Sequence, residues 1–221
     1  MFSTAAWRSC TADDNVYGKG PTGVPYTIRT TLPVFWSANH SVDAANAALK
    51  KQVDEDTREF LDSVNESTPA DQTGGAAFAL REEPRINQLG RLAVVQMTGE
   101  EDVGGASGFS LDNWVNIDTD TWTTLTNKQI LLPAARQPAG AARLATLIAS
   151  SINRMGLSGQ GCKTSAAAIL SHGKTSYQQA MQFGLEGDED HPDVEVDLRC
   201  PTAPGQGSVR ILIREGLKPI A

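Results

Sequence analysis

The chain has 221 residues, of which 40% are hydrophobic and 20% charged, and its formal net charge is −7. This composition excludes a disordered chain, and the length is enough to bury a sizeable core. The acidic balance argues against a nucleic-acid or anionic-membrane surface, because phosphate groups are bound by clustered Lys and Arg. No apolar run approaches the roughly 18 residues of a spanning helix, so we expect no transmembrane segment.

The N-terminal residues predict an extended arm. Residues 11–25 are rich in Gly, Asp and Pro, which divides the chain into an arm over residues 1–25 and a single domain over residues 26–221. The first ten residues lack the apolar centre of roughly 7 to 15 residues found in export signals. Either the protein is cytosolic, or its export signal is missing from this chain.

Alternation of apolar and polar residues over 26–36 predicts a strand with one sheltered face. The sheltered positions are Tyr26, Ile28, Thr30, Leu32 and Val34. Pro33 has no N–H to donate, so it should lie near a sheet edge or at the end of the strand.

The next segment predicts a long amphipathic helix. Ser41 is a favourable N-cap, and Asp43 suits the first turn because of the helix dipole. Apolar residues then recur at helical spacing, and they predict a helix of about six turns lying on a sheet. This stripe consists of Val42, Ala45, Leu49, Val53, Phe60 and Val64. The helix should end before Pro69.

The remaining elements are shorter. Apolar runs predict strands over 77–80, 91–97, 114–118, 129–132, 181–185, 194–198 and 209–213. A second helix is predicted over 139–154, where Gly156 supplies the stop, and a helical turn over 166–170. This order predicts an α+β fold, in which a mixed, mainly antiparallel sheet is packed by one long helix and a second, shorter helix.

The cysteines bear on the compartment. Cys162 and Cys200 lie in polar segments flanked by Gly and Pro, where a buried free thiol is not expected. We predict a disulfide between them, which suits an oxidising compartment; the alternative is two unrelated thiols. Cys10 is then left as a free thiol, an intermolecular partner or a lipid attachment point.

Catalytic and metal-binding motifs are not evident. His40, His172 and His191 show no zinc-ligand spacing. Ser107 and Ser158 each miss the Gly-x-Ser-x-Gly motif of esterases by one position, although a triad can assemble from distant residues. We therefore expect no metal and no cofactor.

Three further patterns have two interpretations each. The acidic stretch 186–193 could wrap calcium, but it lacks the order of an EF-hand loop, and a solvated hairpin turn is the better interpretation. The glycine string 104–108 lacks the Lys-Ser/Thr of a phosphate-binding loop, so we predict a turn. The tryptophans, Trp36, Trp114 and Trp122 among them, are expected in the core, and any that are exposed would be anchors for a partner.

The order of several motifs resembles a known family. A strand with Leu32-Pro33 precedes a helix with Asn46 and Leu49, and a Gly-Gly-Ala-x-Gly turn (104–108) precedes a strand with Asn116-Ile-Asp118. Over about residues 24–155, this order resembles the RsiV-like extracytoplasmic domain, which occurs in lysozyme-sensing anti-sigma factors and in secreted mycobacterial immunogenic proteins. Here Ser107 replaces the histidine of the family's usual Gly-Gly-Ala-His.

The resemblance implies export and a binding role more than catalysis. Together with the acidic charge and the cysteine pair, it predicts a secreted or envelope protein of a Gram-positive, actinobacterial cell that binds a protein or glycan. The alternatives are a secreted esterase-type serine hydrolase and a structural envelope or particle component.

Overall fold

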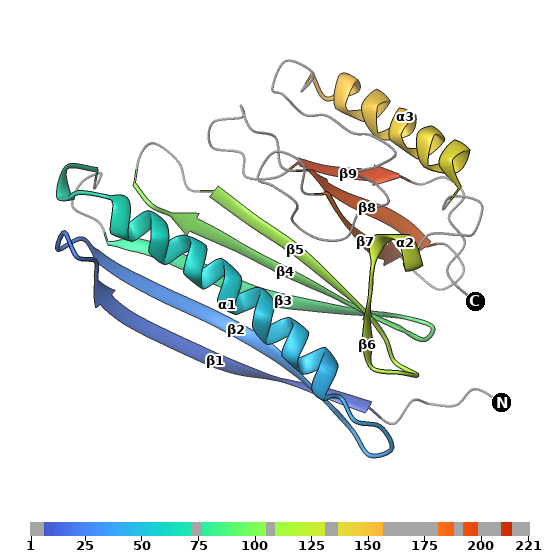
Figure 1. The fold of residues 1–221 in the computed structure, drawn as a ribbon, viewed down its shortest axis with the longest axis horizontal. Coiled ribbons are helices and arrows are strands. Elements are labelled where there is room, and N and C mark those ends of the chain that lie inside the picture. The colour runs from blue at the N-terminus through green and yellow to red at the C-terminus, as the bar shows by residue number, and fades with distance from the viewer. Residues whose placement is uncertain are drawn as a thin grey trace. The chain divides into compact units, whose positions relative to one another are not determined.

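The computed structural model describes residues 7–71, 77–104, 109–130, 137–156, 181–187, 192–198 and 209–213. These residues confirm the predicted α+β fold (Figure 1). The chain forms two compact units. The first unit comprises Met1–Arg85, Met97–Asn113 and Thr119–Thr123, and the second comprises Ile86–Gln96, Trp114–Asp118 and Thr124–Ala221.

A six-stranded sheet has its strands in chain order, β1 to β6. Its strands are β1 (Trp7–Lys19), β2 (Pro25–Ser37), β3 (Phe78–Leu89), β4 (Leu92–Asp102), β5 (Phe109–Asp118) and β6 (Thr123–Leu125). The segment expected to be an arm therefore contributes the strand β1, which pairs with β2 in antiparallel fashion along its whole length. A tight turn at residues 20–23 joins the two strands, and Gly23 adopts φ +90° there.

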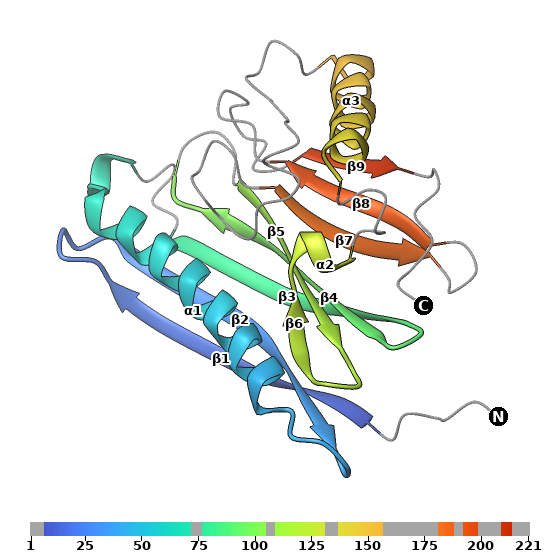
Figure 2. The ribbon, with the colours of Figure 1, turned by 45° about the vertical axis from the view of Figure 1, so that its right-hand side comes forward.

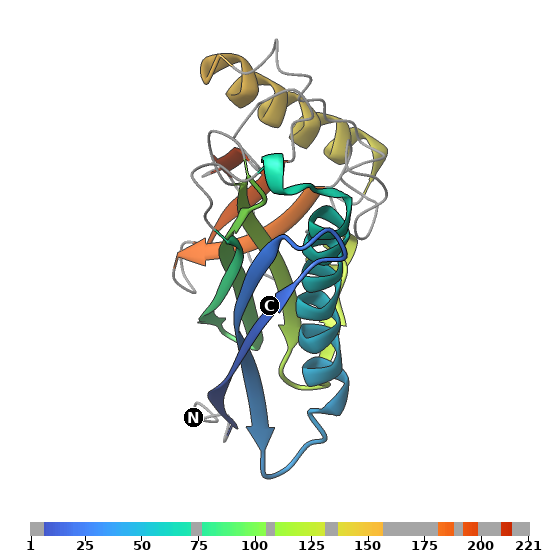
Figure 3. The ribbon, with the colours of Figure 1, turned by 90° about the vertical axis from the view of Figure 1, so that its left-hand side faces the viewer.

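A crossover helix joins the only parallel pair of strands in the sheet's described ladders. Helix α1 (Asp43–Glu66) leaves β2 and returns the chain to β3, which runs parallel to β2. Figure 3 shows α1 against one side of the β1–β2 ribbon. Its buried positions are Ala45, Leu49, Val53, Asp56, Phe60 and Val64. The predicted stripe is confirmed except at Val42, which is the half-buried N-cap, and at Asp56, which the prediction missed.

The start of α1 differs from the prediction by one residue. Val42 is the N-cap and makes no side-chain cap bond, whereas Ser41 lies one position earlier. The Ser41 hydroxyl still accepts a bond from the Asp43 backbone N–H (3.4 Å) and donates to Oδ2 of Asp43 (2.9 Å). The helix ends at Glu66, followed by a short 3-10 turn, η1 (Pro69–Asp71).

The first unit has an apolar core between α1 and the sheet. One cluster of buried side chains contains Val24, Ile28, Phe60, Val64, Phe78, Leu80 and Leu111, drawn from α1, from strands β2, β3 and β5, and from the turn before β2. Most of these side chains are at most 4% exposed. Burial of this kind stabilises a fold by about 25 cal/mol per Å² of apolar surface, so this cluster fixes α1 on the sheet.

The parallel ladder between β2 and β3 is short. It runs only from the pair Tyr26–Phe78 to the pair Thr30–Glu82, after which the two strands separate. Pro33 of β2 and Pro84 of β3 both lie just beyond this ladder. A proline cannot donate to a ladder and is confined to places where a strand lacks a partner. Pro33 thus sits at a local edge inside a long strand, as its missing N–H predicts.

The buried face of β2 differs from the prediction in its second half. Ile28 and Thr30 are buried as expected, but beyond the ladder the buried residues are Pro33 and Phe35, while Leu32 and Val34 are half-buried. The change from even to odd positions occurs where β2 has left β3. In that part of the strand the aromatic ring of Phe35 packs against two tryptophans, and this packing decides which side is buried.

The second unit contains shorter elements. After β6 come the one-turn helix α2 (Asn127–Ile130) and the helix α3 (Pro138–Arg154), the latter as predicted. The strand expected over 129–132 is wrong at Gln129 and Ile130, which lie in α2, where the Thr126 carbonyl oxygen accepts bonds from the N–H groups of both. Residues 131 and 132 lie outside the described residues.

Three strands form a separate antiparallel sheet (Figure 2). They are β7 (Met181–Gly187), β8 (Pro192–Leu198) and β9 (Val209–Ile213), at the positions that the sequence predicts. Gly187 of β7 pairs with Pro192 of β8. The acidic stretch 186–193 therefore connects two antiparallel neighbours, which confirms the hairpin interpretation; residues 188–191 themselves lie outside the described residues.

Candidate functional site

A layer of polar side chains is buried beneath α1. Thr30 and Glu82 end the parallel ladder and are 5% and 1% exposed. Asp56 of α1 and Asn113 of β5 are 3% and 1% exposed. In α1, Asp56 lies one turn before Phe60 of the apolar cluster, and Glu82 and Asn113 lie two positions beyond Leu80 and Leu111 of the same cluster. The polar layer therefore adjoins the apolar core within the first unit.

Hydrogen bonds tie α1 to the sheet in this layer. Nδ2 of Asn113 donates to Oδ2 of Asp56 (2.7 Å), and Nε2 of Gln52 donates to the same oxygen (2.9 Å). Gly99 of β4 makes room next to Glu82, because a Cβ at this position would lie 2.0 Å from the Arg81 carbonyl oxygen. A buried carboxylate is costly unless hydrogen bonds satisfy it. The donors to Asp56 meet this requirement and fix the position of α1 along the sheet.

This layer contains two buried carboxyl groups, which is the residue type used in general acid–base chemistry. However, Asp56 and Glu82 are at most 3% exposed, and a catalytic group must come within hydrogen-bonding reach of its substrate. A substrate could reach them only if α1 moved. We therefore assign the polar layer a structural role.

A side-chain amide extends the sheet where β2 has left β3. The Phe35 backbone N–H donates to Oδ1 of Asn46 (2.8 Å), and Nδ2 of Asn46 donates to the Phe35 carbonyl oxygen (3.0 Å). The Asn46 side chain thus pairs with Phe35 as the peptide group of a neighbouring strand would. Asn46 belongs to the motif on which the family resemblance rests, and this contact gives it a specific structural task.

An aromatic cluster packs at the same end of β2. The rings of Trp7 and Phe35 meet edge to face at 5.4 Å, and Trp122 lies 5.9 Å from Trp7 and 5.4 Å from Phe35 between ring centroids. Trp122 is 1% exposed and adopts φ +56°, a left-handed conformation that costs a residue of this kind of order 1–3 kcal/mol. Burial of an indole of roughly 200 Å² offsets that strain at about 25 cal/mol per Å².

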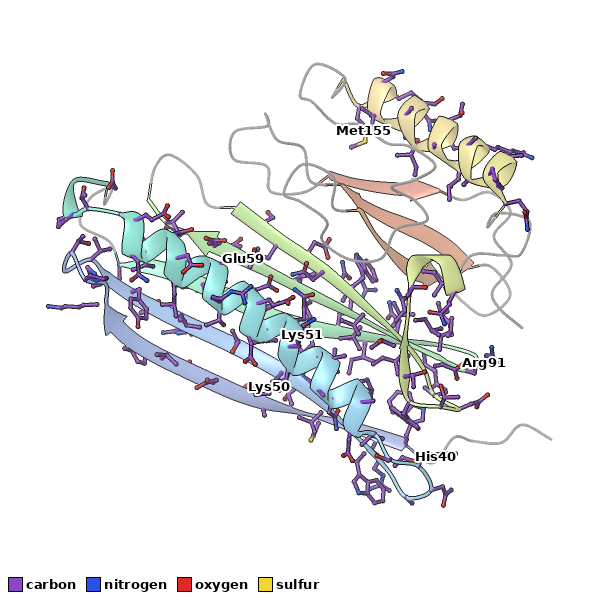
Figure 4. The ribbon with its side chains drawn as sticks, viewed as in Figure 1. His40, Lys50, Lys51, Glu59, Arg91 and Met155 are labelled. Carbon is purple, nitrogen blue, oxygen red and sulfur yellow. The ribbon has the colours of Figure 1, made fainter. Side chains whose placement is uncertain are left out.

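Trp36, next to this cluster, faces solvent. Its side chain is 57% exposed, whereas Trp7 is half-buried and Trp114 and Trp122 are at most 6% exposed. The preceding residue, Phe35, is held by the cluster and by Asn46, so the backbone is fixed on the N-terminal side of Trp36. The exposed loop that follows contains His40, which lies near the start of α1 (Figure 4). We define the Trp36 surface as Trp36 together with residues 38–41.

Gly104 lies two residues after the end of β4 and packs closely against Asp71 of η1. Gly104 adopts φ +89°, and a Cβ there would lie 2.3 Å from the Asp71 carbonyl oxygen. The Thr68 backbone N–H and hydroxyl donate to Oδ2 of Asp71 at 2.7 and 2.8 Å. These two bonds lower the pKa of Asp71 below its usual value of 3.8. Gly104 belongs to the predicted turn; the rest of that turn, 105–108, lies outside the described residues.

Several residues singled out in the sequence also lie outside the described part of the chain: Cys162, Cys200, Ser107, Ser158, His172 and His191. The disulfide therefore stays a prediction. Cys10 is a free, exposed cysteine on β1. Within the described ranges, no three His, Cys, Asp or Glu side chains are grouped so that they could hold a metal ion.

The outer face of α1 is a solvated helix face. Lys50 pairs with Asp54 at 2.6 Å and Lys51 with Glu55 at 3.7 Å, both one turn apart, and Figure 4 shows Lys50 and Lys51 along the helix. Exposed pairs of this kind contribute about 0.3–0.5 kcal/mol each. Among the helices that the structure describes, none is long and apolar enough to cross a membrane.

Comparison with known proteins identifies the fold only. No protein-family model and no curated protein matches the sequence. A solved structure of a DUF3298-family member from Bacteroides fragilis matches 96% of this chain and 91% of its own, with a TM-score of 0.52 and 14% identity. A DUF3298-family protein from Pseudomonas aeruginosa matches 68% of each chain, with a TM-score of 0.44 and 14% identity. The chain thus shares the fold of the Bacteroides protein.

Proposed function

We propose that this protein is a secreted or envelope-anchored binding protein, and that the Trp36 surface contacts its ligand, a protein or a glycan. The observation that supports this best is the exposure of Trp36. A tryptophan that is 57% exposed leaves a large apolar area in water, and tryptophan is among the residues that dominate binding energy at interfaces. The indole can stack on a sugar ring or fill a pocket of a protein.

The backbone that carries Trp36 is held in place by its neighbour Phe35, and this rigidity favours binding. An anchor that is already fixed in its bound position loses little conformational entropy when the ligand arrives. Phe35 provides this rigidity because its ring packs against the rings of Trp7 and Trp122 and its backbone makes two hydrogen bonds to the Asn46 side chain. The loop beside Trp36 adds Asn39, His40 and Ser41, whose polar groups suit the rim of a binding site.

The net charge favours a basic protein as the ligand over an acidic one. A charge of −7 attracts cationic partners and speeds their encounter. The RsiV-like resemblance points in the same direction, because that family includes sensors of lysozyme. The export that the resemblance implies would place the protein where both lysozyme and cell-wall glycans occur.

Calorimetric titration with lysozyme and with soluble peptidoglycan fragments tests the proposal. We expect one of them to bind, and Trp36→Ala to weaken its binding at least about tenfold, which corresponds to roughly 1.4 kcal/mol. Tyr17→Ala is the matched control, because Tyr17 is also an exposed aromatic, 66% exposed, on the distant half of the β1–β2 ribbon. Binding of neither probe, or equal loss in both variants, would refute the proposed surface.

A labelling experiment separates binding from hydrolysis. A fluorophosphonate probe reacts with the activated serine of an esterase. We expect no specific labelling of the folded protein. Labelling that is abolished by Ser107→Ala or Ser158→Ala would establish the hydrolase alternative instead.

A further inference from the structure

We propose that β1 is the interface of a symmetric homodimer, in which the β1 strands of two copies pair edge to edge in antiparallel fashion. β1 is the outermost strand of the six-stranded sheet (Figures 1 and 2). Nearly all of its side chains are exposed, and no described strand pairs with its outer side. Pairing of two β1 strands requires no ligand at the Trp36 surface.

The structure fixes which backbone groups of β1 point outward. The Phe35 N–H and carbonyl both bind Asn46, so they point away from β1. Pro25 and Pro33, which have no N–H to offer β1, are also odd-numbered residues of β2. In an antiparallel pair, residues whose backbone groups point away from the partner strand lie opposite each other. The odd-numbered residues of β2 lie opposite odd-numbered residues of β1, for example Thr11 opposite Pro33.

The odd-numbered residues of β1, from Trp7 to Lys19, therefore direct their N–H and carbonyl groups to the free edge. Natural sheets usually protect such an edge with prolines, bulges, very short strands or charged side chains, especially lysine. β1 has 13 residues, pairs with β2 without a bulge and contains no proline. Its charged residues are Arg8, Asp13, Asp14 and, at its end, Lys19, and opposite charges among them can pair across two copies. Such an edge is suited to accept another strand.

Charge selects a second copy and one register. If two β1 strands pair antiparallel about Thr11, Arg8 of each copy lies opposite Asp14 of the other, which gives two ion pairs related by the two-fold axis. The opposed residues are then Trp7 with Asn15, Arg8 with Asp14, Ser9 with Asp13, Cys10 with Ala12, and Thr11 with itself. The odd-numbered pairs exchange backbone hydrogen bonds, and the even-numbered pairs bring their side chains closest.

The same charges disfavour the register that would pair β1 along its whole length. Centring the two strands on Asp13 places this carboxylate opposite its own copy, and like charges directly opposite each other are destabilising. Asp13 already accepts a bond from the Thr31 hydroxyl (2.9 Å), which holds it at the strand surface. The Thr11-centred register instead sets Asp13 opposite a serine hydroxyl. An isologous contact of this kind closes after two copies.

Sedimentation analysis of the full chain gives the first test. We expect a particle of twice the 23.5 kDa chain mass at about 100 μM. Thr11→Pro removes an outward N–H without touching the bonds to β2, so this variant should be monomeric, while Thr11→Val should remain dimeric. A monomeric wild-type protein, or a dimer that Thr11→Pro leaves intact, would overturn the proposal.

A charge exchange tests the register and does not depend on how Thr11→Pro folds. Arg8→Asp alone and Asp14→Arg alone each set like charges opposite each other and should weaken dimerisation at least about tenfold. The double variant restores two opposite pairs with reversed polarity and should dimerise as the wild type does. If the double variant is as weak as the single ones, Arg8 does not face Asp14 across the interface.

Cross-linking provides an independent measure of the register. Opposed residues in non-hydrogen-bonded pairs have Cα atoms about 4.5 Å apart, which lies within the range that a disulfide spans. Ala12→Cys should therefore form an oxidised dimer with the native Cys10 of the other copy. The same variant with Cys10→Ser should lose this cross-link. A cross-link that survives without Cys10 would contradict the Thr11-centred register.

Discussion

Replacement of Asn46 by Asp tests the paired hydrogen bonds that link α1 to β2. Aspartate keeps the size of the side chain and the oxygen that accepts the Phe35 N–H, but it replaces the Nδ2 donor by a second oxygen. The Phe35 carbonyl then loses its 3.0 Å bond and faces a carboxylate. A partly buried carbonyl left without its donor costs about 1–3 kcal/mol, and repulsion by the carboxylate that now faces it adds to this cost. We expect a loss of about 2–4 kcal/mol in the free energy of unfolding.

Urea unfolding measures this loss. With a slope of about 3 kcal/mol per M for a chain of this size, the midpoint should fall by about 1 M while the slope stays constant. Lys50→Ala is the matched control, because it removes an exposed ion pair of the same helix and should cost less than about 0.5 kcal/mol. Protonation of the new carboxyl restores a donor, so the difference from the wild type should narrow at acid pH.

A loss below about 0.5 kcal/mol for Asn46→Asp would show that the amide is not a substitute strand partner. Equal losses for Asn46→Asp and Lys50→Ala would lead to the same conclusion. In either case only the ring contacts would hold Phe35. The hydrogen bonds to Asn46 would then no longer support the rigidity that we assign to the Trp36 surface.

Two other substitutions test the core and the contact between Gly104 and Asp71, and a reduction experiment tests the predicted disulfide. Leu49→Ala should cost about 2–5 kcal/mol in urea unfolding, because Leu49 is fully buried; a loss below about 0.5 kcal/mol would contradict the buried stripe. Gly104→Ala should lower the melting temperature markedly, because a Cβ meets the Asp71 carbonyl in a left-handed backbone; an unchanged melting temperature would refute the close approach. Reduction should lower the melting temperature if Cys162 and Cys200 form a disulfide, and non-reducing intact mass with alkylation would reveal three free thiols if they do not.

The elements that sequence predicts well are those with a complete local pattern. The α1 stripe repeats through Leu49, Val53 and Phe60, and α3 and the three C-terminal strands also lie where expected. Amphipathic periodicity identifies such elements because each one has a single buried side. The full length of β3 was missed because Arg81–Leu89 is charged and contains Pro84. Those residues form a strand because they pair with β4, which is a contact that no local pattern records.

The strand β1 is a second element that its local sequence does not predict, because it depends on pairing with β2. Residues 7–19 contain few apolar residues, and their exposure agrees with an arm. The strand exists because β2 offers it a complete hydrogen-bonding edge. The sequence does contain one relevant signal. Pro25 and Pro33 both lie at odd positions of β2, and they indicate that the edge toward which odd-numbered residues direct their backbone groups needs no N–H donor at these points. Interpreting that signal requires knowledge that β2 has a neighbour on the other side.

The polar residues of the core were the hardest to predict, although their spacing was informative. Asp56 lies three residues after Val53 and four before Phe60, so it occupies the buried stripe by position and departs from it only by chemistry. Asn113 supplies the reason that a carboxylate is tolerated there, since it donates at 2.7 Å from β5. Asn46 solves the opposite problem, because it offers polar groups to a strand that has lost its partner. Both asparagines place a polar side chain where a peptide group or a charge would otherwise lack a partner, and this requirement arises only once the helix and the sheet are packed together.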